Sequence, residues 1–298
     1  MNNGRGNSRN QGKQGWIIIA GICGVCFLGC LVWLIFYIVG NRNAEAELDD
    51  LRQGYVIDVS GEPLNTAPEP TTVPEASPEP TEEPSPLAEY DIPNKIVDIK
   101  ALQENENEDI YAWIIVPGTV IDYPVLQDPE RLDYYLDHNV DRSSGYPGCI
   151  YSQYLNSTEW DDPNTVLYGH NMKNGSMFAG LHQYEDPQFL EENQYIYIFT
   201  ENYVRVYHIF GAYEFDNRHL LLSMDMNDSV DFAKYLVEVK ALKGMKDHFL
   251  EDVSVSIEDK LLTLETCISN KPDKRYIVQA VLEAEGEWLL ESDDAAEE

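Results

Sequence analysis

Residues 261–267 read LLTLETC, and residues 275–282 read RYIVQAVL. In the first segment leucine alternates with threonine and glutamate, which is typical of a half-buried β-strand. The seven residues 268–274 are rich in Ser, Asn, Pro and Asp, and we interpret them as a loop. Antiparallel strands joined in this way lie about 4.8 Å apart. We therefore expect Cys267 and Arg275 to lie near the same end of a sheet, within side-chain reach.

The rest of the C-terminal two thirds of the chain is also rich in short β-prone runs. We expect an N-terminal helix with Asp91 as its cap and Leu102 near its end, and a second helix over residues 229–242. This pattern predicts a mainly β fold, an eight-stranded closed or nearly closed barrel with these two helices. The other expected strands are residues 113–116, 120–126, 148–151, 165–168, 195–199, 203–215 and 253–257.

The N-terminal segment has the pattern of a membrane anchor. Residues 16–39 carry no charge and are long enough to cross a hydrocarbon core of about 30 Å. Basic residues precede this segment and acidic ones follow it, which predicts a cytoplasmic N-terminus and an extracellular remainder. A cleaved signal peptide or a lipidated Cys30 fits less well, because apolar residues continue to Val39. The expected parts are a basic tail 1–15, an anchor 16–39 in membrane lipid, a Pro/Glu-rich linker 40–87, a catalytic domain 88–290 and an acidic tail 291–298.

Charge and cysteine usage exclude several classes of protein. The formal net charge of −33 excludes a nucleic-acid-binding protein on electrostatic grounds. Outside the apolar segment only Cys149 and Cys267 remain, so there is no disulfide framework, although a single Cys149–Cys267 bridge remains an alternative. No His and Cys residues have convincing zinc spacing, and we expect neither a metal nor another cofactor.

Three residues have the chemistry of a thiol-based acyl transferase. Cys267 is the expected nucleophile, because a thiolate at a strand end is accessible for attack. His170, which follows the apolar run 165–168, is the expected general acid and base. Arg275 cannot lose its charge and presents a fixed fork of donors, which suits an oxyanion or the substrate backbone.

The remaining histidines and Cys149 are weaker candidates. His138 is the main rival of His170, and we interpret it as structural. Cys149 follows a glycine in a β-rich run and is interpreted as a small buried residue. The histidines without a matching strand-end position are His182, His208, His219 and His248.

These motifs resemble the sortases, and within that family class B. The segment 263–267 is similar to the family's Thr-Leu-x-Thr-Cys strand, and YGHNMKNGSMF, residues 168–178, resembles class B strongly. WIIVPGT at 113–119 and the helix at 229–242 fit the family's first strands and the additional helix of class B. The resemblance covers roughly residues 90–285. It implies a sortase-like barrel on a single membrane anchor.

The resemblance also implies the reaction and its partners. Cys267 would cleave a C-terminal sorting signal of a secreted protein at Thr–Gly or Thr–Asn and transfer the acyl group to a peptidoglycan amine. Thr266, Glu265 and Asn171 are the implied substrate-binding residues. Glu265 departs from the family pattern, which often has Ser there. A carboxylate pointing at Cys267 would raise the pKa of the thiol, whereas one turned to solvent would have little effect.

Other functions fit part of the sequence. A pilin-polymerising sortase would use a pilin lysine as its acceptor. A membrane-tethered cysteine protease would hydrolyse the same thioester, although the order of His170 and Cys267 is the reverse of that in papain-like enzymes. A non-catalytic surface module on an acidic stalk would not need the three catalytic residue types. Peptide turnover with and without an amine separates these alternatives.

Overall fold

The computed structural model describes residues 8–58 and 85–287, and the chain divides into two compact units, Met1–Ala46 and Glu47–Glu298. The first unit consists of most of helix α1, Ser8–Tyr55. Its part within Gly21–Tyr55 is apolar and long enough to cross a membrane. This helix overlaps the anchor expected over residues 16–39, whose bounds and orientation stay a prediction. Most of the expected linker and the whole expected acidic tail lie outside the described residues.

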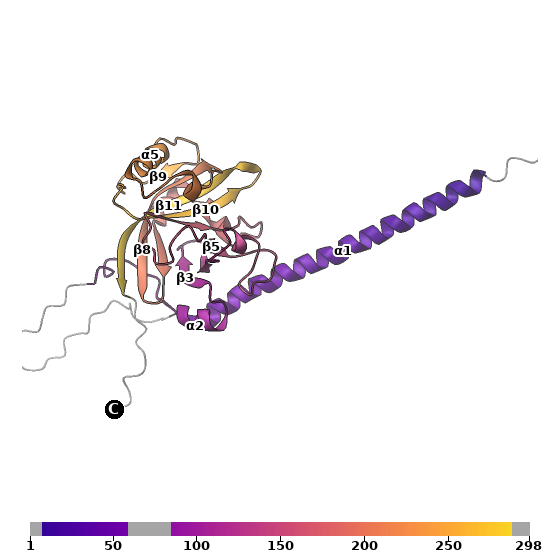
Figure 1. Ribbon diagram of the computed structural model, residues 1–298, viewed down its shortest axis with the longest axis horizontal. Coiled ribbons are helices and arrows are strands. Elements are labelled where there is room, and N and C mark those ends of the chain that lie inside the picture. Colours follow the sequence, from indigo (N-terminus) through magenta and orange to yellow (C-terminus); the bar gives the residue numbers. More distant parts are fainter. Residues whose placement is uncertain (1–7, 59–84, 288–298) are drawn as a thin grey trace, which may run out of the picture. The chain divides into compact units, whose positions relative to one another are not determined.

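The second unit contains a closed eight-stranded β-barrel, as expected from the sequence. Its strands are hydrogen-bonded in the order β11-β10-β6-β5-β4-β3-β7-β8, and β11 pairs with β8 to close the barrel (Figure 1). The two-residue strand β9 pairs antiparallel alongside β8, at Gly211 and Ala212. The barrel strands are β3 Ile110–Ile115, β4 Asp122–Leu126, β5 Ile150–Ser152, β6 Asn164–Tyr168, β7 Tyr195–Phe199, β8 Tyr203–Asp216, β10 Leu261–Ile268 and β11 Lys271–Glu287.

Short helices and three small strands complete the unit. In Figure 1, α2 and α5 lie at opposite ends of the barrel. The remaining elements are β1 Val56–Asp58, β2 Lys95–Val97, α2 Ile99–Asn105, the 3-10 helices η1 Tyr134–Leu136 and η2 Phe178–Glu185, α3 Pro187–Glu192, α4 Leu220–Ser223, α5 Ser229–Lys240 and β9 His248–Phe249.

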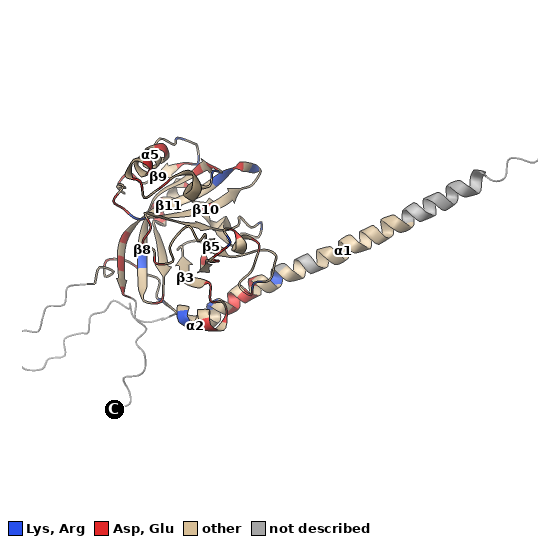
Figure 2. Cartoon of the chain, in the orientation of Figure 1, with Lys and Arg blue, Asp and Glu red and all other residues tan. Residues whose placement is uncertain are grey.

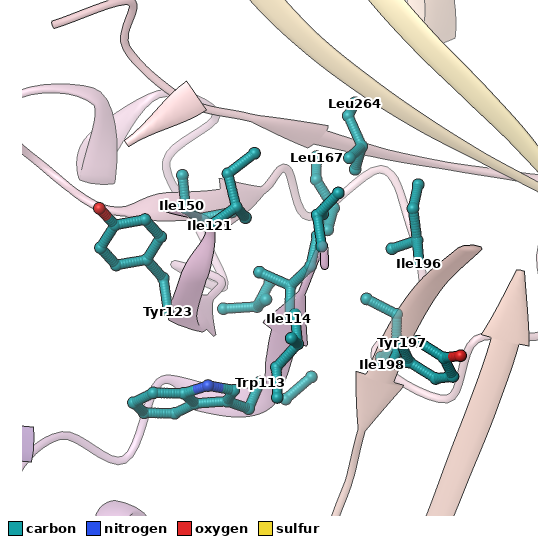
Figure 3. Packing of buried hydrophobic residues seen from close by; sticks show 14 of the residues in the cluster. Trp113, Ile114, Ile121, Tyr123, Ile150, Leu167, Ile196, Tyr197, Ile198 and Leu264 are labelled. Carbon is teal, nitrogen blue, oxygen red and sulfur yellow. The ribbon is translucent and has the colours of Figure 1, made fainter. Parts of the chain in front are cut away.

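The main apolar core is formed by large side chains from strands that are distant in sequence. Trp113 and Ile114 from β3, Leu167 from β6 and Leu264 from β10 are fully buried and pack in one cluster (Figure 3). Burying one such side chain contributes about 1.5–3 kcal/mol. This packing fixes the strands that carry the site.

Helix α5 covers a second, smaller apolar cluster outside the barrel. Asp228 caps the helix by accepting hydrogen bonds from the backbone N–H groups of Val230 and Asp231. Phe232 and Tyr235 are buried against β8 and β11. The chain has 53 acidic and 20 basic residues, and Figure 2 shows both kinds on many elements of this unit.

Four details differ from the sequence-based expectations. The N-terminal helix does not begin at Asp91: Lys95–Val97 forms a strand that pairs with Val56–Asp58, and α2 starts after the cap Asp98. No strand forms over residues 253–257. The expected loop 268–274 is replaced by a two-residue turn at 269–270, where Asn270 takes a left-handed conformation with φ 64°. The polar composition of residues 268–274 had indicated a longer loop.

The fourth difference concerns the start of the globular unit. Residues 40–55, expected in the linker, are helical, and the unit begins at Glu47. Leu48 and Leu51 are buried in the main core, and the Arg52 side chain donates a 2.7 Å hydrogen bond to the backbone carbonyl of Asp122. The end of α1 is therefore part of the fold.

Candidate active site

The site forms at the ends of two neighbouring parallel strands. Strands β6 and β10 pair in register, with Tyr168 opposite Glu265. The pairing continues beyond β6, because the Gly169 N–H donates to the Glu265 carbonyl at 3.3 Å and the Thr266 hydroxyl donates to the Gly169 carbonyl at 2.8 Å. A Cβ on Gly169 would lie 2.5 Å from Ile150 Cδ1 and 2.8 Å from the Phe178 ring, so a larger residue would require these side chains to shift. His170 and Cys267 therefore leave the barrel at the same edge.

A cleft of about 210 Å³ opens at this edge. Cys267 is exposed, while His170 and Arg275 are half-buried, and all three line the cleft. The structure thus brings together the three residues that the sequence singled out. The other lining residues are Asp133, Leu136, Tyr151, Gln153, Tyr168, Gly169, Asn217, Arg218, His219, Glu265 and Thr266.

The His170 ring is oriented by the backbone. Its Nε2 lies 2.7 Å from the Leu136 carbonyl oxygen, which can only accept, so Nε2 carries the proton. The other ring nitrogen, Nδ1, is then free to accept a proton. Burial lowers the pKa of His170, against the opposing effects of the Leu136 hydrogen bond and the Asp137 charge. A neutral imidazole is therefore favoured at neutral pH.

Arg275 lies directly opposite Cys267 because of a bulge. The register with β10 passes from Cys267–Arg275 to Ile268–Lys271, so residues 272–274 of β11 have no partner on β10, whereas Lys274 pairs with Asp216 of β8. The Arg275 guanidinium donates through Nη1 to the carbonyls of Pro272 and Lys274, at 3.2 and 2.9 Å. The bulge thus sets Arg275 opposite Cys267, and carbonyl groups of the bulge bind the guanidinium.

Glu265 is buried, and its carboxylate contacts Arg275. It is only 9% exposed, and its Oε1 lies 3.3 Å from Arg275 Nε. Burial raises the pKa of Glu265 from 4.5 to about 7, the Arg275 charge opposes this shift, and the Asp133 and Asp216 carboxylates add to it. The solvent-facing alternative is therefore wrong, and the contact partner of the carboxylate is Arg275.

The sortase domain model matches residues 114–283. The chain belongs to the sortase family. It is 36% identical over 181 residues to sortase B of Listeria monocytogenes, which covers 59% of this chain and 70% of that protein. It is 30% identical over 179 residues to sortase B of Staphylococcus aureus, covering 59% and 71%. These similarities identify a class B sortase, a transpeptidase.

Solved structures agree with this assignment. The Staphylococcus aureus sortase B–substrate complex has a TM-score of 0.55 and 28% identity, covering 62% of this chain and 83% of that one. Sortase B of Clostridium perfringens, solved in a mutant form, has a TM-score of 0.54 and 32% identity, covering 61% and 85%. The barrel of this sortase is therefore the fold of the class.

The other expected substrate-binding residues have internal partners in this sortase. Thr266 lines the cleft, but its hydroxyl is used by the Gly169 carbonyl. Asn171 donates its amide Nδ2 to the Cys267 carbonyl at 2.9 Å and is not among the residues that line the cleft. Both side chains bind backbone carbonyl groups of the site. Their contact with substrate stays a prediction.

Several residues of the sortase cleft had no signal in the sequence. The Asp133 carboxylate accepts hydrogen bonds from Tyr151 at 3.1 Å and from Gln153 at 2.8 Å. Arg218 pairs with Asp216 and, at 2.7 Å, with Glu238 of α5, and so ties the helix to the cleft wall. These contacts join elements that are distant in sequence and follow no local motif.

Of the weaker sequence candidates, His219 lines the cleft, whereas His138 and Cys149 do not. His138 stacks on Tyr134 with ring centroids 3.9 Å apart, and its Nδ1 lies 2.9 Å from the Tyr134 carbonyl oxygen. Cys149 is buried, and burial raises the pKa of its thiol. Both Cys149 and Cys267 are free, so the alternative of a bridge between them is wrong. In the described part of the chain no group of three or more His, Cys, Asp or Glu side chains could hold a metal.

Proposed function

We propose that this class B sortase cleaves a C-terminal sorting signal of secreted proteins and joins the acyl fragment to an amine of cell-wall peptidoglycan. The observation that carries the proposal is the cleft in which an exposed Cys267 faces the same space as His170 and Arg275. A peptide ligand is supported by the related Staphylococcus aureus enzyme, whose structure was solved as a substrate complex. The cleaved bond follows threonine, before Gly or Asn, as the resemblance to class B implies.

In the first half-reaction, the Cys267 thiol passes its proton to Nδ1 of neutral His170, and the resulting thiolate attacks the carbonyl carbon of the scissile bond. The negative charge that develops on the carbonyl oxygen is stabilised by the Arg275 guanidinium, which keeps its charge throughout. The C–N bond then breaks, and His170 donates a proton to the leaving amine. The products are a thioester on Cys267 and a free C-terminal fragment.

The second half-reaction resolves the thioester. An acceptor amine attacks the thioester carbonyl, and neutral His170 takes the proton that the amine loses. The C–S bond breaks, the new amide forms, and Cys267 leaves as a thiolate. Because burial lowers the pKa of His170, more of the imidazole is ready to accept this proton at neutral pH.

The location of the reaction follows from the apolar helix. We propose that residues 16–39 span the membrane with the basic N-terminal tail in the cytoplasm, because basic residues precede the span and acidic residues follow it. The catalytic domain, expected over residues 88–290, then lies outside the cell, where secreted substrates and wall peptides occur. Membrane topology is checked by protease accessibility of the domain in intact cells.

The test is turnover of sorting-signal peptides ending in Thr–Gly and Thr–Asn, with and without a peptidoglycan-derived amine. We expect a transfer product, a thioester on Cys267 detectable by mass spectrometry, and no turnover by Cys267→Ala. Cys149→Ala is the matched control and keeps the wild-type rate. Activity that survives in Cys267→Ala would disprove the proposed nucleophile.

The same assay separates the alternative functions. Hydrolysis without transfer to any amine would indicate a cysteine protease, and transfer only to a pilin lysine would indicate a polymerising sortase. His170→Ala is expected to lower the rate by at least about a hundredfold. If His138→Ala is inactive and His170→Ala is active, the assignment of the proton carrier is wrong.

A further inference from the structure

The backbone carbonyl of Cys267 contacts two side chains. The ladder between β10 and β11 breaks its register between Cys267 and Ile268. At this break, the Asn171 amide donates through Nδ2 to the Cys267 carbonyl oxygen at 2.9 Å, and His182 Nε2 lies 3.1 Å from the same oxygen. Two side chains from outside the ladder therefore converge on the residue that carries the thiol.

A chain of polar contacts extends behind these two side chains. His182 Nδ1 lies 2.9 Å from Glu185 Oε1, and the other oxygen of Glu185 pairs with Lys246. Asn171 Nδ2 also lies 2.9 Å from His182 Nε2. The contacts thus run from a surface lysine to the peptide unit of the nucleophile.

The hydrogen atoms of this chain can be placed consistently. The Glu185 carboxylate accepts the proton on His182 Nδ1, which leaves Nε2 as an acceptor. The Asn171 amide has two N–H groups, so one donates to His182 Nε2 and the other to the Cys267 carbonyl. The 3.1 Å approach of His182 Nε2 to the Cys267 oxygen is then a contact between two acceptors and not a hydrogen bond, so Asn171 holds the carbonyl and His182 orients the Asn171 amide.

His182 and its hydrogen-bond partners Asn171 and Glu185 lie outside the cleft lining. The His182 ring stacks on Tyr276, with centroids 5.1 Å apart and planes inclined by 25°. Neither His182, Glu185 nor Lys246 lines the cleft. The side chains of His182 and Glu185 are 21% and 24% exposed, so they lie at the edge of the barrel core.

We propose that His182, held by Glu185 and acting through Asn171, is a positioning residue for the Cys267 nucleophile. The inference rests on the proposed role of Cys267. A peptide unit is planar, so fixing the Cys267 carbonyl fixes the backbone from which the thiol projects. Misplacing a reacting atom by about 1 Å costs about a hundredfold in rate. The register break interrupts the regular β10–β11 hydrogen bonds directly after Cys267. Other contacts must therefore fix the orientation of the thiol.

The test compares two substitutions of His182, each of which retains a polar group at the position of only one of the two ring nitrogens. His182→Gln carries its amide at the position of Nε2 and can still accept from Asn171. His182→Asn carries its amide at the position of Nδ1, so it keeps the Glu185 contact and loses the Asn171 contact. In the full-length enzyme we expect His182→Asn to lower kcat for thioester formation about ten- to hundredfold with KM unchanged, whereas His182→Gln stays within about threefold of wild type.

The matched control is His208 on β8, which pairs with Glu283 at 3.2 Å and does not line the cleft. His208→Asn is expected to keep both kcat and KM. The melting temperature of each variant is measured alongside, because a merely structural role would lower stability in both His182 variants without separating their rates.

Three outcomes overturn the inference: wild-type rates in both His182 variants, equal losses in both, or a change in KM alone. If the wild-type enzyme forms no thioester at all, or Cys267→Ala remains active, the proposed function fails instead. The two failures are therefore distinguished by the wild-type and Cys267→Ala reactions in the same experiment.

Discussion

Replacing Glu265 with glutamine is expected to remove part of the pH dependence of stability. Burial raises the pKa of Glu265 from 4.5 to about 7 in the folded protein. Between these values the unfolded chain has lost the proton while the folded chain keeps it. The free energy of unfolding therefore falls as pH rises through this window, and the loss is complete above about pH 7.

The size of the effect follows from the shift. A pKa change of one unit corresponds to about 1.4 kcal/mol, so the whole shift corresponds to about 3 kcal/mol. From pH 5 to pH 8 the wild type should lose about 2 to 3 kcal/mol that Glu265→Gln, which cannot ionise, does not lose. The lowered pKa of His170 is present in both proteins and cancels in their difference.

The assay is urea unfolding of the full-length protein in detergent, followed by the fluorescence of the buried Trp113 and Trp160. Asp128→Asn is the control. Burial raises the pKa of Asp128, but hydrogen bonds from Arg131 and from backbone N–H groups outweigh this and lower the pKa. The stability that the Asp128 carboxylate contributes therefore changes with pH only below pH 5. A stability difference between wild type and Glu265→Gln that stays constant from pH 5 to pH 8 would refute the reasoning.

Three further predictions concern the residues around the thiol. Arg275→Lys is expected to lower kcat/KM for peptide transfer at least about a hundredfold, because an ammonium lacks the guanidinium fork; a near-wild-type rate would contradict this. Thr266→Val leaves the Gly169 carbonyl without its 2.8 Å hydrogen bond and should cost about 1–3 kcal/mol in urea unfolding, whereas an unchanged midpoint would argue against it. Iodoacetamide should label Cys267 and spare the buried Cys149 until the protein unfolds, and mass spectrometry of native samples would expose any equal labelling.

The barrel could be predicted from the sequence because its signals are local. Alternating leucines mark β10, and the apolar runs of β6, β7 and β8 are bounded by turn residues. The positions of Cys267 and His170 near strand ends followed from these same patterns, whereas Arg275 lies inside β11, which begins at Lys271. The confirmed part of the fold is thus the part that each strand encodes by itself.

The errors arose where distant segments decide the local structure. Lys95–Val97 has the isoleucine spacing of a helix, but it pairs with Val56–Asp58, a partner that the sequence had assigned to the linker. Polar residues 272–274 indicate a loop, yet they form a bulge in β11 that is held between β10 and β8. Tertiary pairing overrode local propensity in both cases.

The supporting residues of the site were missed for a related reason. His182 reaches the Cys267 carbonyl across 85 positions of the chain, and no motif marks a contact of this kind. Glu265 was recognised as unusual, but alternation along a strand does not reveal that Arg275 on the next strand would bind its carboxylate. Both contacts depend on the register between strands.

The position of β10 links the chemistry of the enzyme to the completion of its fold. β10 lies between β6 and β11, and β11 closes the barrel against β8. The Thr266–Gly169 contact, which aligns the nucleophile with the imidazole, spans 97 residues, and pairings of such high contact order form slowly. A chain that has been synthesised only as far as α5 already contains His170 but has neither the thiol nor a closed barrel. Closure of the sheet and assembly of the reactive centre are therefore one event, so a partly folded chain is also a chemically silent one.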